Sequence, residues 1–197
     1  MSHSELDRRD FLKKTLLAGA SAGALAAGAT PASAQDTDGE GAKLAETVPR
    51  TELGNTGVKI PILVVGCAMK FNPRYDKILH HAYKEGINYL DTALAYAKGQ
   101  SHATIAPFVK QIGDRTKLWI TSKGPHHRNK ATPETFERDL DISLRQLEVD
   151  YLDMFFMHGI NNPKYLTKEY VDMGERFRKQ KKSKFFGFSC HGGNVVD

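Results

Sequence analysis

Four polar residues recur along the chain at a spacing that could bring their side chains to one place. Asp91, Lys123, His158 and Ser189 each follow a short apolar segment, and they are separated by roughly the 30 residues of one strand-and-helix unit in an eight-stranded barrel. Because parallel strands end at the same rim, these side chains are expected to converge there. Tyr96 lies shortly after Asp91, on the loop leaving the same strand, and can reach that rim.

An acid, a lysine, a tyrosine and a histidine at one rim could act together as a proton donor to a carbonyl. A tyrosine hydroxyl has an unperturbed pKa of about 10 and needs a neighbouring positive charge to serve near neutral pH. Lys123 would supply that charge to Tyr96, Asp91 would hold Lys123 in place, and His158 would orient the substrate oxygen. Taken singly, each residue also has a structural interpretation. Asp91 could cap a turn and Lys123 could lie on the surface. His158 could be a hydrogen-bonded rim histidine, and Tyr96 could be a packed ring.

From Arg50 onward, the segments that must position these residues alternate between extended and helical patterns. The first segment, 50–60, contains Gly54-Asn55-Thr56-Gly57 and predicts a β-hairpin. Strands are then expected over 62–66, 87–92, 117–122, 151–157 and 184–189. Helices are expected over 75–85 with Tyr75, Ile78, Leu79 and Ala82 on one face, over 104–112 with Pro107 in the first turn, over 133–147 after Thr132, and over 167–181.

Alternation of strands and helices predicts a parallel sheet, which could be a doubly wound open sheet or a (β/α)₈ barrel. Periodicity alone does not choose between the two. No Gly-x-Gly-x-x-Gly segment follows the first expected strand, which argues against a Rossmann dinucleotide site.

The motifs around the candidate residues resemble those of the aldo/keto reductase family. The resemblance rests on Asp91-Thr92-Ala93 with Tyr96, Ile120-Thr121-Ser122-Lys123, Asp150-Tyr151-Leu152-Asp153 leading to His158, and the hairpin segment Leu53-Gly54-Asn55-Thr56-Gly57-Val58. It extends from about Arg50 to Gly192. It implies an α/β fold: a partial (β/α)₈ TIM barrel of about five βα units, preceded by an N-terminal β-hairpin.

The resemblance also implies an activity, the interconversion of a small carbonyl substrate and an alcohol by hydride transfer with NADP, or NAD, as cofactor. Tyr96 would be the general acid, Lys123 and Asp91 its supporting pair, and His158 the carbonyl-orienting residue. The cofactor would be contacted by Gly66, Asp91, Ser189 and His191.

Three positions depart from the family pattern. Ala97 stands where glycine usually follows the tyrosine, and His102 stands where an acid is common; both are expected to be loop changes that alter substrate fit. At the fifth strand the usual Ser-Asn pair is Ser189-Cys190 followed by His191, so His191 either replaces the amide contact or lines the rim. The Ser-x-His form resembles a family branch with a C-terminal ferredoxin-like extension.

The sequence ends shortly after the fifth expected strand, so the barrel is interpreted as incomplete. Strands six to eight, with much of the cofactor site, would be missing, and the unpaired edges would favour self-association. A second interpretation is therefore a non-catalytic barrel that serves as a binding or regulatory module.

The first 34 residues have the layout of a twin-arginine export signal. Arg8-Arg9 precede an apolar run over 16–29, and Ala32-Ser33-Ala34 offers a cleavage site near Ala34. The apolar run is shorter than the roughly 20 residues that a spanning helix needs, so no stable membrane insertion is expected after cleavage. The prediction is a periplasmic protein with a signal at 1–34, a flexible linker at 35–49 and the barrel at 50–197.

The charge and the cysteine content argue against a nucleic-acid-binding protein and against an iron-sulfur protein. The net charge of +5 is scattered, which does not favour nucleic-acid binding, and the basic stretch 176–184 is interpreted as the solvated end of a helix. Cys67 and Cys190 cannot hold an iron-sulfur cluster by themselves. They are expected to be buried or pocket-lining thiols, and no metal site is expected.

Overall fold

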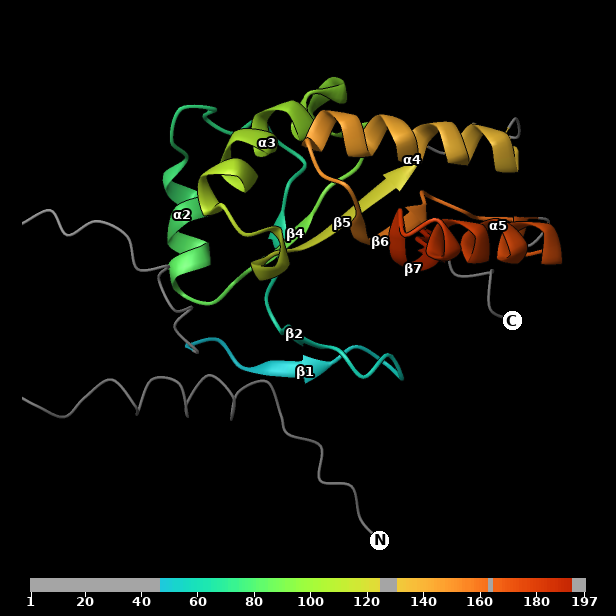
Figure 1. Cartoon of the computed structure of the whole chain (residues 1–197), viewed down its shortest axis with the longest axis horizontal. Coiled ribbons are helices and arrows are strands. Elements are labelled where there is room, and N and C mark those ends of the chain that lie inside the picture. The colour runs from blue at the N-terminus through green and yellow to red at the C-terminus, as the bar shows by residue number, and fades with distance from the viewer. Residues whose placement is uncertain (1–46, 125–130, 163–164, 193–197) are drawn as a thin grey trace, which may run out of the picture. The chain divides into compact units, whose positions relative to one another are not determined.

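The computed structural model describes residues 47–124, 131–162 and 165–192, which all belong to the unit Ala42–Asp197. The predicted signal at 1–34 and most of the linker at 35–49 lie outside the described residues and stay predictions. The described strands form a two-stranded antiparallel sheet and a five-stranded parallel sheet in the order β3-β4-β5-β6-β7 (Figure 1). The predicted combination of a hairpin with a partial parallel barrel is therefore confirmed.

The hairpin consists of β1 (Arg50–Glu52) and β2 (Lys59–Pro61). Its turn is closed by a hydrogen bond from the Leu53 N–H to the Val58 carbonyl, 2.9 Å long. Gly54 and Gly57 adopt positive φ angles of 52° and 72° there, which glycine reaches without steric strain. The hairpin packs on the inner face of the sheet, where Ile60 joins Trp119 and Met154 in a small buried cluster.

The parallel sheet is built from strands whose carboxyl ends lie at one rim. They are β3 (Val65–Gly66), β4 (Tyr89–Asp91), β5 (Trp119–Gly124), β6 (Leu152–Met157) and β7 (Ser183–Phe188). Strand β3 is shorter than the predicted 62–66. The strand is short because β3 pairs with β4 only over Val65 and Gly66. Ile62, Leu63 and Val64 precede it and are 50%, 53% and 49% exposed.

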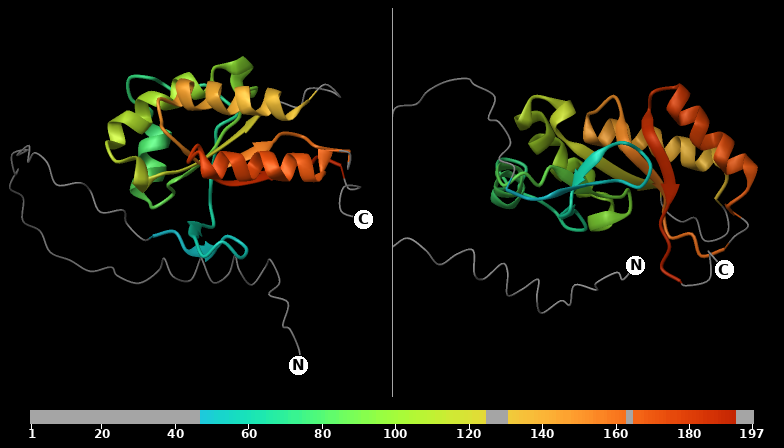
Figure 2. Two further views of the ribbon diagram at one scale, coloured as in Figure 1. Left: turned by 45° about the vertical axis from the view of Figure 1, so that its right-hand side comes forward. Right: turned by 90° about the horizontal axis from the view of Figure 1, so that it is seen from below.

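Helices connect the strands and cover the outer face of the sheet. They are α2 (Lys77–Lys84), α3 (Ser101–Ile112), α4 (Pro133–Leu147) and α5 (Lys168–Lys179). The start predicted for α4 is confirmed: the Thr132 hydroxyl accepts a hydrogen bond from the Thr135 N–H, and proline occupies the first helical position. Figure 1 shows α3 and α4 on one side of the sheet and the hairpin on the other, and the left view in Figure 2 agrees.

Two details of the predicted helices are wrong. Helix α3 begins at Ser101 and not at Thr104, so Pro107 lies beyond the first turn, where its ring opposes the carbonyl four residues earlier. In α2, Asp76 caps the backbone N–H groups of Ile78 and Leu79, so Tyr75 precedes the helix. Tyr75 is 55% exposed and Ile78 60% exposed, whereas Leu79 is buried as predicted.

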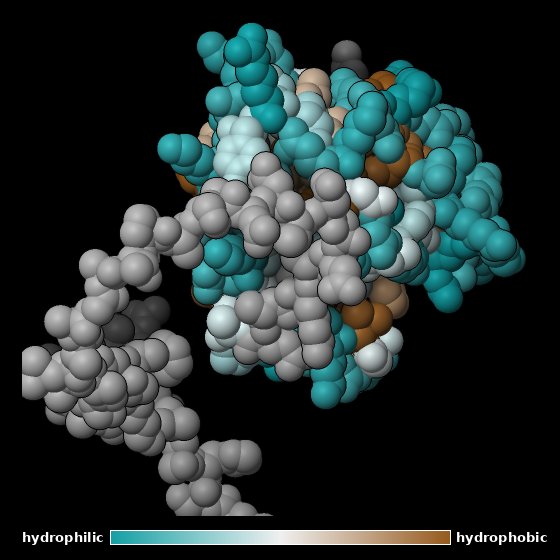
Figure 3. Space-filling view, turned by 60° about the vertical axis from the view of Figure 1, so that its left-hand side comes forward, coloured by the Kyte–Doolittle hydropathy of each residue, from teal (hydrophilic) through white to brown (hydrophobic). Residues whose placement is uncertain are grey.

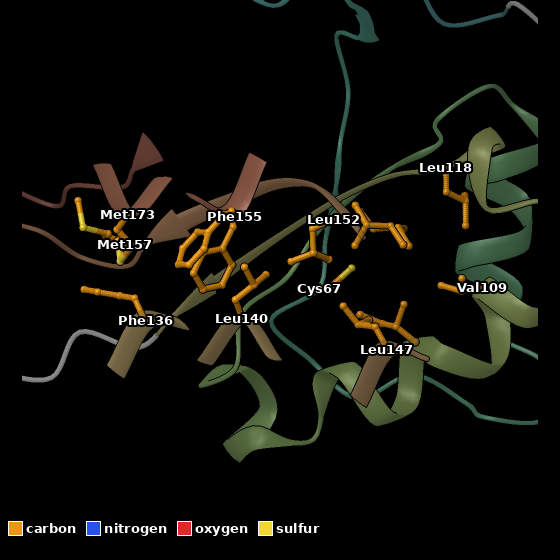
Figure 4. Close-up of a cluster of buried hydrophobic side chains, with 14 of the residues drawn as sticks. Cys67, Val109, Leu118, Phe136, Leu140, Leu147, Leu152, Phe155, Met157 and Met173 are labelled. Atoms are coloured by element: carbon orange, nitrogen blue, oxygen red, sulfur yellow. The ribbon is translucent and has the colours of Figure 1, made fainter. Parts of the chain in front are cut away.

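The main core lies between the sheet and the helices. Phe136, Leu140 and Leu147 of α4 pack in one cluster with Leu152 and Phe155 of β6 (Figure 4). Each fully buried side chain of this size contributes about 1.5–3 kcal/mol through removal of apolar surface from water. This cluster fixes α4 on the strands whose ends carry the candidate site.

The two cysteines differ in their surroundings. Cys67 is fully buried in the main core (Figure 4), as predicted. Cys190 is exposed, so of the two predicted states it is not the buried one. Cys190 follows the end of β7 at the rim, where the chain leaves the sheet.

One face of the surface is mainly polar. Figure 3 shows one face on which hydrophilic side chains predominate and hydrophobic ones occur in small groups. Over the ranges that the structure describes, no helix has both the length and the apolar content needed to cross a membrane.

Candidate active site

Lys123 lies at the centre of the group that the sequence singled out. Its ammonium nitrogen Nζ lies 2.8 Å from the Asp91 carboxylate, 3.0 Å from the Thr92 carbonyl oxygen and 3.3 Å from the Tyr96 hydroxyl oxygen. A lysine ammonium has three N–H donors, and these acceptors match all three. The Lys123 side chain is only 6% exposed, so the charge depends on these partners to offset its removal from water.

The strand register explains why Lys123 and Asp91 meet. Asp91 ends β4 and pairs with Thr121 of β5, two residues before Lys123, on the same face of the sheet. Below them the Thr121 hydroxyl donates to the Tyr89 hydroxyl at 3.0 Å and accepts from the Trp119 indole N–H at 3.1 Å. The charged pair therefore rests on a layer of hydrogen-bonded aromatic side chains inside the partial barrel.

Tyr96 is held at the rim by the backbone of its own loop. The Tyr96 N–H donates to the Ala93 carbonyl, and the Leu94 N–H donates to the Lys123 carbonyl, each at 3.1 Å. Tyr96 opens a short 3₁₀ turn, Tyr96–Gly99, in which Ala97 has a φ of 51° and Lys98 a φ of 56°. A left-handed conformation costs a non-glycine residue about 1–2 kcal/mol, so the loop that presents the hydroxyl is strained.

His158 completes the group. Its ring stands edge-on to the Tyr96 ring with centroids 5.5 Å apart, and its backbone N–H donates to the Gly124 carbonyl at 3.0 Å. The Lys123 ammonium also lies 4.7 Å from the centre of the Tyr96 ring. The structure thus brings Asp91, Tyr96, Lys123 and His158 to one rim, where Asp91 and Tyr96 both contact the Lys123 ammonium and His158 packs against the Tyr96 ring.

The residues expected to contact a cofactor surround the same rim. The Ser189 hydroxyl accepts a hydrogen bond from the Gly159 N–H at 3.0 Å, which leaves its own proton available. The His191 ring lies 6.2 Å from that of His158, and the His191 N–H donates to the Asn161 side-chain oxygen at 3.1 Å. Gly66 is paired with Asp91, and a Cβ atom built on Gly66 would meet nothing within 4 Å.

His102 is not a loop residue, which corrects the sequence-based expectation. It lies in the first turn of α3 and is only 1% exposed. Its Nε2 lies 2.9 Å from the Ser122 hydroxyl and its Nδ1 lies 3.0 Å from the Gln146 side-chain oxygen. Burial is the main reason that the pKa of His102 falls to about 4. One feature of the sequence could have indicated this position. If Lys123 faces the barrel interior, Ser122 must face the helices, where its hydroxyl needs a polar partner such as His102.

Cys67 lies close to the site, but its thiol is protonated and unreactive near neutral pH. Burial, followed by the nearby Asp91 carboxylate, raises the pKa of the Cys67 thiol to about 12, and the thiol is hydrogen-bonded to the Val65 carbonyl at 3.3 Å. A thiol in this state is not a nucleophile near neutral pH. Within the described ranges, no three His, Cys, Asp or Glu side chains lie together in a way that could hold a metal ion.

Comparison with known proteins gives the family. Residues 70–192 match the sequence profile described as the aldo/keto reductase family. The chain is 26% identical over 137 residues to an aldo-keto reductase named for NADP(+) from Schizosaccharomyces pombe, an alignment covering 62% of this chain. It is 34% identical over 122 residues to a glycerol 2-dehydrogenase (NADP(+)) from Saccharomyces cerevisiae, covering 58% of this chain. The alignments span 40% and 36% of the lengths of these two relatives.

A solved structure supports the fold. The holo form of an aldo-keto reductase from Bacillus halodurans superposes with a TM-score of 0.64 at 23% identity. The superposition covers 76% of this chain and 52% of that protein. Since the family profile spans more than half of the sequence and the parallel sheet agrees with the solved structure, the chain belongs to the aldo/keto reductase family.

Proposed function

We propose that the protein interconverts a small carbonyl compound and an alcohol by hydride transfer, with NADP(H) as the cofactor and NAD(H) as the alternative. The observation that carries the proposal is the Lys123 ammonium, which contacts both the Asp91 carboxylate at 2.8 Å and the Tyr96 hydroxyl at 3.3 Å. Family membership supports it, as do two relatives whose names specify NADP(+).

In this proposal Tyr96 gives its hydroxyl proton to the carbonyl oxygen of the substrate. The Lys123 ammonium stabilises the phenolate that remains, because it already donates a hydrogen bond to that oxygen. Asp91 keeps Lys123 aimed at Tyr96 by an ion pair from the neighbouring strand. His158 stands beside the Tyr96 ring and orients the same carbonyl oxygen by a hydrogen bond.

The residues around the rim fit a nicotinamide. The Ser189 hydroxyl has a proton to donate to an amide oxygen, because it accepts a hydrogen bond from the Gly159 N–H. Gly66 leaves the adjacent strand end without a side chain, in open space, and His191 offers a second polar group. When bound, a reduced nicotinamide supplies the hydride for the carbonyl carbon.

The test is a carbonyl reduction assay on the 197-residue chain, together with fluorescence titration of NADPH. We expect saturable NADPH binding and turnover of a reactive aromatic aldehyde. Tyr96→Phe should lower kcat by at least about 100-fold, which is the usual contribution of a general acid, without weakening NADPH binding.

Tyr75→Phe is the matched control, because Tyr75 is exposed and lies outside the site. It should behave as the wild-type chain does. A folded wild-type chain that binds no NADPH would refute the proposal and favour a non-catalytic binding or regulatory module.

We also propose that residues 1–34 direct export to the periplasm by the twin-arginine route, on the strength of Arg8-Arg9 and the apolar run that follows. N-terminal sequencing of periplasmic protein should begin near Gln35. Retention of the complete chain in the cytoplasm, unchanged when both arginines are replaced by lysine, would contradict this.

A further inference from the structure

His102 occupies a buried position between the loop that carries Tyr96 and the strand that carries Lys123. It lies in the first turn of α3, directly after that loop, and is 1% exposed. Its ring spans two other elements, since it contacts Ser122 of β5 and Gln146 of α4. A polar ring buried this deeply is stabilised only when both of its nitrogens have partners.

The partners fix which ring nitrogen carries the proton. The Gln146 side-chain oxygen is an acceptor 3.0 Å from Nδ1, so Nδ1 donates to it. Nε2 then accepts from the Ser122 hydroxyl at 2.9 Å. Both nitrogens of a neutral imidazole are used, one as donor and one as acceptor. The Lys123 ammonium is the charged group that acts on this ring, and it favours the neutral form.

Ser122 connects this ring to the candidate site. It directly precedes Lys123 on β5 and faces the helices while Lys123 faces the barrel interior. The contact between His102 and Ser122 therefore holds the backbone of β5 from its outer side, one residue from the ammonium. No atom of His102 is hydrogen-bonded to Lys123 or Tyr96 in the contacts described, so His102 can act on them only through its partners.

Ser101, the residue before His102, connects the end of the Tyr96 loop to its beginning. The Ser101 hydroxyl lies 2.9 Å from the Thr92 hydroxyl and donates to the Cys67 carbonyl at 2.6 Å. Thr92 follows Asp91 directly and begins the loop. Ser101 and His102 therefore clamp the start of α3 to β4 and β5 together.

The loop between these anchors is strained, since Ala97 and Lys98 both have positive φ angles. A strained segment keeps its conformation only when the surrounding structure holds it. The side chain of Tyr96 itself has one hydrogen-bonding partner among the contacts described, the Lys123 ammonium. The distance between the two groups is thus set by how the ends of the loop are fastened to β5.

We infer that His102 is a positioning residue, which sets the distance between the Tyr96 hydroxyl and the Lys123 ammonium through its hydrogen bond to Ser122. The inference rests on the proposed reductase function, because it concerns the two residues that would move the proton. Displacement of a reacting group by about 1 Å can lower a rate by roughly 100-fold, so a modest shift at Ser122 should be visible in kcat.

Two amide substitutions separate the contacts of the ring. His102→Gln places an amide near the position of Nε2 and keeps an acceptor for Ser122, whereas His102→Asn places it near Nδ1 and keeps the contact with Gln146 only. We expect His102→Gln to stay within about twofold of the wild-type kcat and His102→Asn to fall about tenfold. The KM for the aldehyde and the Kd for NADPH should not change in either variant. Ser122→Ala should reproduce the effect of His102→Asn.

A control and a structural readout make the outcomes decisive. His80→Asn removes an exposed histidine–glutamine contact between α2 and the other end of α3, the 2.8 Å hydrogen bond between His80 and Gln111, and should leave kcat unchanged. Crystal structures of the His102→Asn and wild-type chains give the distance between the Tyr96 hydroxyl and the Lys123 ammonium. This distance should be near 3.3 Å in the wild-type chain and longer in His102→Asn.

Equal losses in His102→Asn and His102→Gln, in proportion to lost stability, would overturn the inference, and so would an unchanged kcat in both. If the wild-type chain has no turnover, the proposed function fails. The Tyr96-to-Lys123 distance in the variant crystal then decides the positioning role by itself: a longer distance supports it and an unchanged one overturns it.

Discussion

The buried neutral ring of His102 should make the fold sensitive to acid. An unfolded chain protonates this histidine below its ordinary pKa of 6.5, whereas burial lowers the pKa in the folded chain to about 4. Between these values the unfolded state binds more protons than the folded state, so folding stability falls as the pH falls. The contribution is fully present above pH 6.5 and is lost by about pH 4.

The gap between the two pKa values sets the size of the effect. Each pH unit corresponds to 1.36 kcal/mol for one proton, so the gap from 6.5 to about 4 corresponds to about 3 kcal/mol. This is a large part of the 5–15 kcal/mol by which domains are typically stable. His102 is 1% exposed, so solvent screening reduces the figure little.

The assay is urea unfolding of the wild-type chain and His102→Asn at a series of pH values from neutral to about pH 4. Every other titrating group is common to both proteins, so the difference between the two stability curves isolates His102. His102→Asn should be less stable at neutral pH, because a hydrogen bond to Ser122 is lost. On acidification the stability difference between the two chains should move by about 3 kcal/mol in favour of the variant, enough to cancel or reverse this deficit. Parallel curves for wild type and His102→Asn would refute the reasoning.

Three further substitutions test the packing and the loop by urea unfolding. Ala97→Gly should stabilise the chain by about 1 kcal/mol, because the φ of 51° strains alanine and not glycine; a destabilised variant would contradict the loop conformation. Gly174→Ala should destabilise by about 1–3 kcal/mol despite the helix preference of alanine, because the new Cβ would lie 2.3 Å from the Phe186 ring; an unchanged midpoint would rule out this approach of α5 to β7. Asp153→Asn should cost about 3 kcal/mol, since this buried carboxylate pairs with two cations and caps a backbone N–H, whereas the exposed control Asp172→Asn should cost less than about 1 kcal/mol.

The sequence was a good guide to the strands and to the residues at their ends. Lys123 and Asp91 could be assigned to one rim because residues that end parallel strands share an edge, and the spacing is that of the strand-and-helix unit. The start of α4 was equally clear, because Thr132 and Pro133 have a local role that does not depend on the rest of the fold.

The parts that could not be predicted depend on contacts between distant segments. Ser101 and His102 look like polar loop residues, yet their hydrogen bonds to Thr92, Ser122 and Gln146 extend α3 backwards and bury them. Periodicity identifies apolar faces but not polar side chains that are buried because they have partners across the fold. Strand β3 was overestimated for a related reason: an apolar run becomes a strand only where a neighbour pairs with it.

The central claim is that Tyr96, supported by Lys123 and Asp91, donates the proton in a hydride transfer to a carbonyl. Its most direct test uses the 197-residue chain, a reactive aromatic aldehyde and NADPH carrying deuterium at the transferring position, with the alcohol product analysed by mass spectrometry. The account predicts deuterated alcohol from the wild-type chain and from Tyr75→Phe, and at least about 100-fold less from Tyr96→Phe. Deuterium transfer at the same rate in Tyr96→Phe, or none from a wild-type chain that binds NADPH, would contradict it.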